Sequence, residues 1–272
     1  MLTLGAPTAA ARAQAVAPIA FDPVIARQGT SLVLGVDGSA LSSDGELPTS
    51  ITVAMPRGTV ADAAARKQLC NRGQAARGTC PADSRIGFGR YVIGVSGFLA
   101  PGGQTQLTWA IDAFLGTRSK PHDVASVVLV AKLLGADSVS TLLAPDLGVT
   151  VRSTSTSTAR LVRRATGRYG IELLIPGLPV DLQVPAPTTA APARFELNLS
   201  AVRQVRENFI RRYRIRTLSG YVVRRIRDHR LVGHNLLRTP ASCGGSWPYE
   251  LRLAFRDGVQ RSAGKFPCSK AF

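Results

Sequence analysis

The sequence has few of the residues from which metal sites and redox centres are built. It contains three histidines, four cysteines and two methionines in 272 residues. No Cys-x-x-Cys pair occurs, so the usual signatures of a zinc knuckle and of a redox-active dithiol are missing. The chain also lacks any run of about 18 apolar residues, which excludes a transmembrane helix on sequence grounds. We therefore expect a protein with no cofactor and no metal site.

Lysine and acidic residues are scarce as well, and arginine is abundant. Five of the 34 cationic side chains are lysine and the rest are arginine, against 17 acidic residues, which gives a formal net charge of +17. The hydrophobic content of 45% is that of a globular chain and not of a disordered one. Such an excess of positive charge indicates either a generally cationic exterior or an anionic partner.

The cysteines and the amino terminus indicate export. Cys70 with Cys80 and Cys243 with Cys268 form two local pairs far apart in the sequence, a spacing that favours two small disulfide loops over a shared zinc site. Residues 1–15 end in Ala-Gln-Ala, the small-x-small pattern that precedes signal-peptide cleavage. We therefore interpret residues 1–15 as the remnant of a signal peptide and predict a secreted or cell-surface protein.

Strict alternation of apolar and polar residues predicts an all-β fold. The pattern is typical of antiparallel strands with one face on a core and one in water. Residues 124–134 are apolar without alternation, which favours a strand buried on both faces, with a helix as the alternative that periodicity alone leaves open. We expect a jelly-roll-like antiparallel β-sandwich over residues 16–272. The alternating positions are Leu32 to Val36, Ile51 to Met55, Leu107 to Ala113, Tyr169 to Ile175, Phe195 to Ala201 and Tyr249 to Phe255.

Three further segments complete the predicted layout. One short helix near Cys70 is expected, with residues 60–69 as its best candidate. The proline-rich residues 176–192 form either a long surface connection within one domain or a junction between two modules. The chain closes with a hairpin around an Asp257-Gly258 turn. In that register Cys268 lies opposite Trp247, where a disulfide to Cys243 would clip the open end.

Two segments resemble uncharacterised exported all-β proteins of high-GC actinobacteria. The first runs from Cys70 through Gly-Thr-Cys80-Pro to Ser-Arg-Ile-Gly87, and the second from Thr239-Pro through Cys243 and Trp247 to Pro-Cys268. The resemblance implies export, β architecture and the two disulfides. It implies no catalytic residue.

The strongest candidate for a binding site is a segment rich in arginine. Residues 160–230 hold fifteen arginines and five acidic residues, a net charge of +10. Arg212, Arg214 and Arg216 alternate with Tyr213 and Ile215, so they line one face of a strand and suit a row of repeating anionic groups. Few aromatic residues interleave with them, which argues against nucleic acid. An acidic polysaccharide, an anionic wall polymer or lipid headgroups fit better, and a merely solvated face is the alternative.

The sequence therefore predicts a non-catalytic secreted or cell-surface binding or structural protein, held to anionic envelope polymers by arginines. The alternative is a carbohydrate-active enzyme, a glycoside hydrolase or lyase, on the same scaffold. Such an enzyme needs two carboxylates facing each other across a cleft. Its candidate carboxylates are Asp112, Glu172, Glu196 and Glu250.

Overall fold

The structure is a computed structural model, and it confirms the predicted fold class of an antiparallel β-sandwich. The predicted signal-peptide remnant, residues 1–15, lies outside the part of the chain that the structure describes. The described residues are 19–22, 24–38, 48–96, 104–135, 150–164, 166–177, 182–183, 189–217 and 220–270.

One thirteen-stranded sheet makes up the body of the protein. Its strands follow the order β17-β16-β3-β10-β9-β7-β6-β5-β12-β2-β15-β4, and β1 also pairs with β2. They are β1 (Ile19–Asp22), β2 (Gly29–Asp37), β3 (Ser50–Pro56), β4 (Val60–Ala61), β5 (Arg85–Ser96), β6 (Gln104–Gly116), β7 (Asp123–Leu133), β9 (Thr154–Arg163), β10 (Tyr169–Pro176), β12 (Thr189–Leu199), β15 (Leu237–Arg238), β16 (Ser246–Phe255) and β17 (Gly258–Pro267).

Two further pairs of strands lie outside this sheet. The short strands β8 (Thr150–Val151) and β11 (Leu182–Gln183) pair with each other, and so do the long strands β13 (Val202–Thr217) and β14 (Gly220–Asn235).

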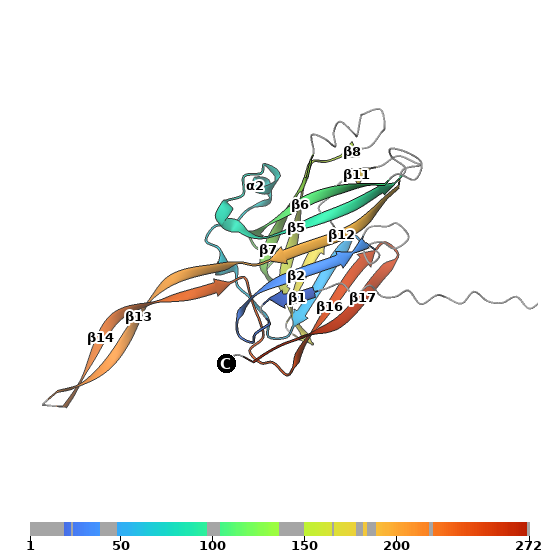
Figure 1. The fold of residues 1–272 in the computed structure, drawn as a ribbon. Coiled ribbons are helices and arrows are strands. Elements are labelled where there is room, and N and C mark those ends of the chain that lie inside the picture. The colour runs from blue at the N-terminus through green and yellow to red at the C-terminus, as the bar shows by residue number, and fades with distance from the viewer. Residues whose placement is uncertain are drawn as a thin grey trace, which may run out of the picture.

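The strands of the body sheet surround one large hydrophobic cluster, and Figure 1 shows how they are arranged. Each alternating strand turns its apolar residues inward, as in β2, where Leu32, Leu34 and Val36 are fully buried between partly exposed neighbours. Strand β17, at one end of the strand order, also approaches β1, which pairs with β2 near the other end. The rings of Phe21 in β1 and Phe266 in β17 lie 4.9 Å apart, which closes this side of the core.

Strand β7 is buried on both faces, as its unbroken apolar run predicts. Its second face packs Val128 and Val130 against the Cys70–Cys80 loop, which carries the short helix α2 (Arg72–Ala76). The helix therefore lies inside the disulfide loop, and its prediction over residues 60–69 is wrong in position. That segment instead forms β4 and the 3-10 turn η1 (Ala63–Ala65). The capping box of Asn71 and Gln74 starts the helix after the cysteine.

The closing hairpin and its disulfide form, but the predicted register is wrong. Phe255 pairs with Gly258 around a loop of Arg256 and Asp257, so Trp247 lies opposite Phe266 and not opposite Cys268. Both registers turn the same residues of β16 toward the core, so the hydrophobic pattern cannot distinguish them. The disulfide Cys243–Cys268 nevertheless joins the open end.

The chain on either side of the proline-rich stretch belongs to the same sheet. Strand β10 ends at Pro176, and β12, which contains Pro192, pairs with β2 and β5. Residues 178–181 and 184–188 of this stretch lie outside the described residues.

Candidate anion-binding arm

Strands β13 and β14 form a long hairpin that extends away from the body, which we call the arm (residues 202–235). Figure 1 shows it as an orange ribbon reaching far beyond the sandwich. Sixteen residue pairs join its two strands, from Val202 with Asn235 to Thr217 with Gly220. At about 3.3 Å per residue, the arm is about 50 Å long.

The base of the arm is held by the body at η1. The Arg66 guanidinium donates a hydrogen bond of 2.8 Å to the carbonyl oxygen of Val202, and His234 Nδ1 lies 2.8 Å from Asp62 Oδ2. Asp62 also caps η1, since its side chain accepts a hydrogen bond from the Ala64 amide. These contacts fix the arm where it leaves the sandwich and reach no farther along it.

The two faces of the arm differ in charge. Residues directly opposite in an antiparallel pair share a face, and successive residues alternate between faces. The face that contains Arg212 carries six arginines and no acidic residue, and we call it the cationic face. Its arginines are Arg206, Arg212, Arg214, Arg216, Arg225 and Arg227.

The predicted anion-binding residues Arg212, Arg214 and Arg216 all lie on this cationic face, and all three are exposed. Arg212 stands directly opposite Arg225 across the hairpin. Two like charges in directly opposed positions destabilise a strand pair. The cationic face therefore carries a repulsion that no acidic residue on the same face compensates, although Arg214 lies over the ring of Tyr221, 5.9 Å from its centroid.

The opposite face, which we call the mixed face, combines four arginines with two acidic residues. Its two acidic residues, Glu207 and Asp228, lie 3.5 Å from Arg230 and 3.8 Å from Arg211 respectively. The guanidinium of Arg230 also lies over the ring of Phe209, 5.7 Å from its centroid. The two faces therefore differ in that acidic residues accompany the arginines on the mixed face and are absent from the cationic face.

Alternation around Arg212, Arg214 and Arg216 does not identify Arg225 and Arg227, because these two lie on the partner strand β14. Arg206 lies on the same face of β13 but six positions before Arg212, outside the alternating run. A signal for the isolated arm was present in the sequence. Between residues 202 and 235 charged residues occupy both strand faces, so neither face is apolar enough to be buried in a sandwich. Asp228, His229 and His234 lie near one another in the sequence but are not brought together, since the neighbours Asp228 and His229 lie on opposite faces of the arm.

The four carboxylates proposed for an enzyme are each engaged by arginine. Asp112 lies 2.6 Å from Arg85, and Glu172 is buried between Arg164 and Arg252, which also approaches Glu250. Glu196 is shared by two guanidinium groups, those of Arg90 and Arg194. The hydrogen bond from Arg90 lowers the pKa of Glu196. A general acid needs the opposite shift.

A fifth carboxylate, Asp123, makes a buried ion pair with consequences for stability. Its side chain is fully buried, and Arg160 Nε donates to both of its oxygens at 3.0 and 2.9 Å. These hydrogen bonds from Arg160 lower the pKa of Asp123. The pair therefore stabilises the fold at neutral pH, and this contribution is lost as the pH falls below the ordinary range of an aspartate and through the lowered pKa of Asp123.

We expect Arg160→Met to lower the free energy of unfolding at pH 7 by about 3–5 kcal/mol, because Asp123 is left buried and unpaired. Urea unfolding at neutral and at acidic pH measures this, and the deficit should shrink once Asp123 is protonated in the variant. The exposed neighbour Arg163→Met is the matched control. A deficit of equal size at both pH values would contradict the assignment.

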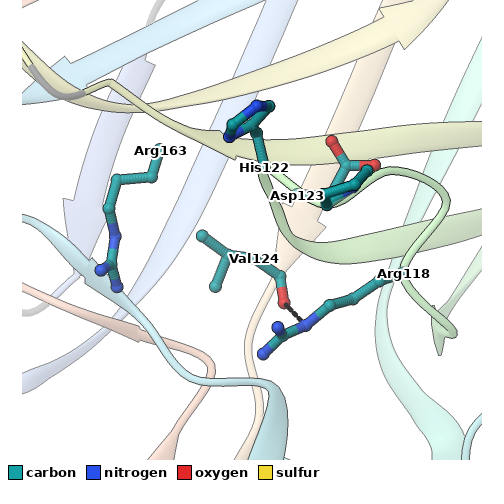
Figure 2. Close-up of a pocket in the computed structure, with 6 residues that line it drawn as sticks. Arg118, His122, Asp123, Val124 and Arg163 are labelled. Carbon is teal, nitrogen blue, oxygen red and sulfur yellow. Dashed lines mark hydrogen bonds between the residues drawn. The ribbon is translucent and has the colours of Figure 1, made fainter.

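The described surface of the body includes a larger and a smaller hollow. The larger, of about 520 Å³, lies over β1, β2, β5 and β12, with the exposed ring of Phe88 and with Glu196 as the acidic residue in its lining. The smaller, of about 350 Å³, lies beside the β6–β7 connection. Figure 2 shows Arg118 and Arg163 on either side of Val124 there, with Arg118 Nε donating to the Val124 carbonyl at 3.1 Å.

Neither hollow joins two carboxylates in its lining. Among the described residues, no group of three or more His, Cys, Asp or Glu side chains is placed to hold a metal ion. None of the helices in the described ranges has the length and apolar composition to span a membrane.

No model of a known protein family matches the chain, and comparisons with curated proteins and with solved structures found no significant match. The resemblance to exported actinobacterial β proteins stays a prediction. The structure therefore defines the protein by its architecture, which is a β-sandwich with two disulfides and a cationic arm.

Proposed function

We propose that this is a non-catalytic, exported binding protein that attaches to an anionic component of the cell envelope through the cationic face of its arm. One observation carries the proposal. Six exposed arginines share a face that holds no acidic residue, and two of them, Arg212 and Arg225, oppose each other directly. A bound row of phosphate or carboxylate groups would relieve this repulsion and accept paired hydrogen bonds from each guanidinium.

Export is part of the same proposal. It is supported by two disulfides, which persist in oxidising compartments. Envelope polymers such as acidic polysaccharides, anionic wall polymers and the headgroups of acidic lipids all present repeating negative charges. The alternative of a carbohydrate-active enzyme has less support, because its candidate carboxylates are engaged by arginines.

Reversal of the three predicted arginines tests the proposal. Each cationic side chain near an anionic surface contributes about 1 kcal/mol. Arg212→Glu, Arg214→Glu and Arg216→Glu together should therefore weaken retention on isolated cell envelopes at low salt by about 100-fold or more.

The matched control changes the same number of charges on the body. Arg72, Arg261 and Lys265 are exposed there, and their replacement by Glu should leave most of the retention intact. The two variants should have equal circular dichroism spectra and melting temperatures. Equal retention of both variants would overturn the assignment of the arm as the attachment site.

A further inference from the structure

The distal half of the arm differs from its base in charge, and it also exposes apolar side chains that charge binding alone does not explain. We define the distal half as Arg211–Thr217 of β13 and Gly220–Ile226 of β14. It holds six arginines and no acidic residue. The acidic residues of the arm, Glu207 and Asp228, both lie in the proximal half.

Apolar and aromatic side chains interleave with these arginines and are open to solvent. Tyr221 is 67% exposed, Val223 53% and Val222 50%. They occupy both faces, since Tyr221 and Val223 lie on the cationic face and Val222 on the mixed face. The same holds for the remaining members of the set, which are Tyr213, Ile215 and Ile226 on the mixed face.

Apolar residues on both faces argue against a partner that covers only one side. A linear polyanion or a flat protein surface would contact one face of the ribbon and leave the other in water. A lipid interface surrounds a short element that enters it, so it accepts apolar side chains on either face, while arginines extend to the headgroups. Tyrosine also favours the boundary between headgroup and hydrocarbon.

We infer that the distal half of the arm is a membrane-interface anchor, which enters the headgroup layer of an anionic lipid surface. The inference rests on the proposed function and specifies that the anionic component of the envelope is a lipid surface. The proximal half would remain outside the interface and act as a spacer, because it carries both acidic residues of the arm, Glu207 and Asp228, which an anionic lipid surface repels. Each arginine that nears an acidic lipid adds to the attraction, and the apolar side chains add the area that leaves water.

Two tryptophan probes at matched positions test the depth of entry. Tyr221 and Leu231 are both on the cationic face of β14, 67% and 69% exposed, but in the distal and proximal halves respectively. With vesicles of phosphatidylcholine and phosphatidylglycerol, Tyr221→Trp should shift its emission to shorter wavelength and be quenched by brominated lipid. Leu231→Trp should show neither change. The two native tryptophans are subtracted using the unmodified protein.

Removal of the apolar side chains separates lipid entry from simple charge binding. Val222→Ser together with Val223→Ser should lower vesicle partitioning by about tenfold, because less apolar area enters the interface. Binding of soluble polyphosphate by the same variant should be unchanged. The valines lie on the exposed arm, so the body should melt as in the unmodified protein.

Three results would overturn the inference. If vesicles bind but Tyr221→Trp shows no shift, the arm binds headgroups by charge alone. If polyphosphate binds and vesicles do not, the partner is a polymer. In both cases the proposed function survives. If neither binds, the proposed function fails together with the inference.

Discussion

Removal of residues 202–235, with Ala201 joined to Leu236 by a short Gly-Ser linker, is expected to leave the sandwich folded and to abolish envelope attachment. The two ends of the excised segment are already neighbours, since the Leu236 amide donates a hydrogen bond of 2.8 Å to the Ala201 carbonyl. Both residues are buried in the body. The arm can therefore be removed, and its two ends joined, without distorting the core.

The stability of the excised variant should change little. The interactions that hold the base of the arm are partly exposed, such as the pair of His234 with Asp62, and pairs of this kind contribute at most about 1 kcal/mol each. An isolated two-stranded ribbon adds little stability of its own. Thermal melting should show a transition within a few degrees of the intact protein, whereas retention on envelopes should fall to background.

Net charge is the factor that this comparison must control. The arm holds ten arginines and two acidic residues, so its removal lowers the formal net charge from +17 to +9. A full-length variant with glutamate at four exposed body positions has the same net charge and keeps the arm. That variant should still bind. Binding by the excised protein, at the level of the intact one, would show that attachment resides in the body. The four positions are Arg72, Arg77, Arg261 and Lys265.

Replacement of Cys243 and Cys268 by serine is expected to destabilise the body by about 3.5 kcal/mol, from the loop-closure entropy of a crosslink over 25 positions. The bond joins the segment before β16 to the end of β17, at the edge of the sheet. The aromatic contact of Phe266 with Phe21 lies close to it in sequence and closes the core there. Loss of the bond should allow this edge to open first.

The melting temperature measures this effect. For a chain of this size a loss of 3.5 kcal/mol corresponds to a decrease of about 7–14 °C. The Cys70–Cys80 bond spans 10 positions, so its removal should cost less, about 2.7 kcal/mol. Reductant should lower the melting temperature of the unmodified protein by at least the decrease expected for loss of the Cys243–Cys268 bond. No change with reductant would mean that the bonds do not stabilise the protein.

The sequence predicts those parts of the fold in which one face is buried. Alternation locates β2, β6, β12 and β16, because burial on one side forces a period of two. The continuous apolar run of β7 predicts burial on both faces, although only the structure shows that the Cys70–Cys80 loop covers the second face.

Other features could not be predicted, because the sequence pattern leaves them open. The register of the closing hairpin depends on whether Arg256 or Gly258 joins the loop, and both choices keep Phe255 in the core. Arg212, Arg214 and Arg216 are placed on one face by alternation alone. Arg225 and Arg227 join the same face only because β13 pairs with β14, and the sequence pattern does not give this pairing.

The salt dependence of envelope binding by the intact protein tests the central claim most directly. Attachment through exposed arginines should be strong at about 0.05 M NaCl and largely lost by about 0.5 M, because counter-ions screen charges at the surface. The bound fraction of purified protein on isolated envelopes, measured across this range, gives the answer. The account predicts a steep decline with added salt. Binding that is absent at low salt, or unchanged at high salt, would contradict it.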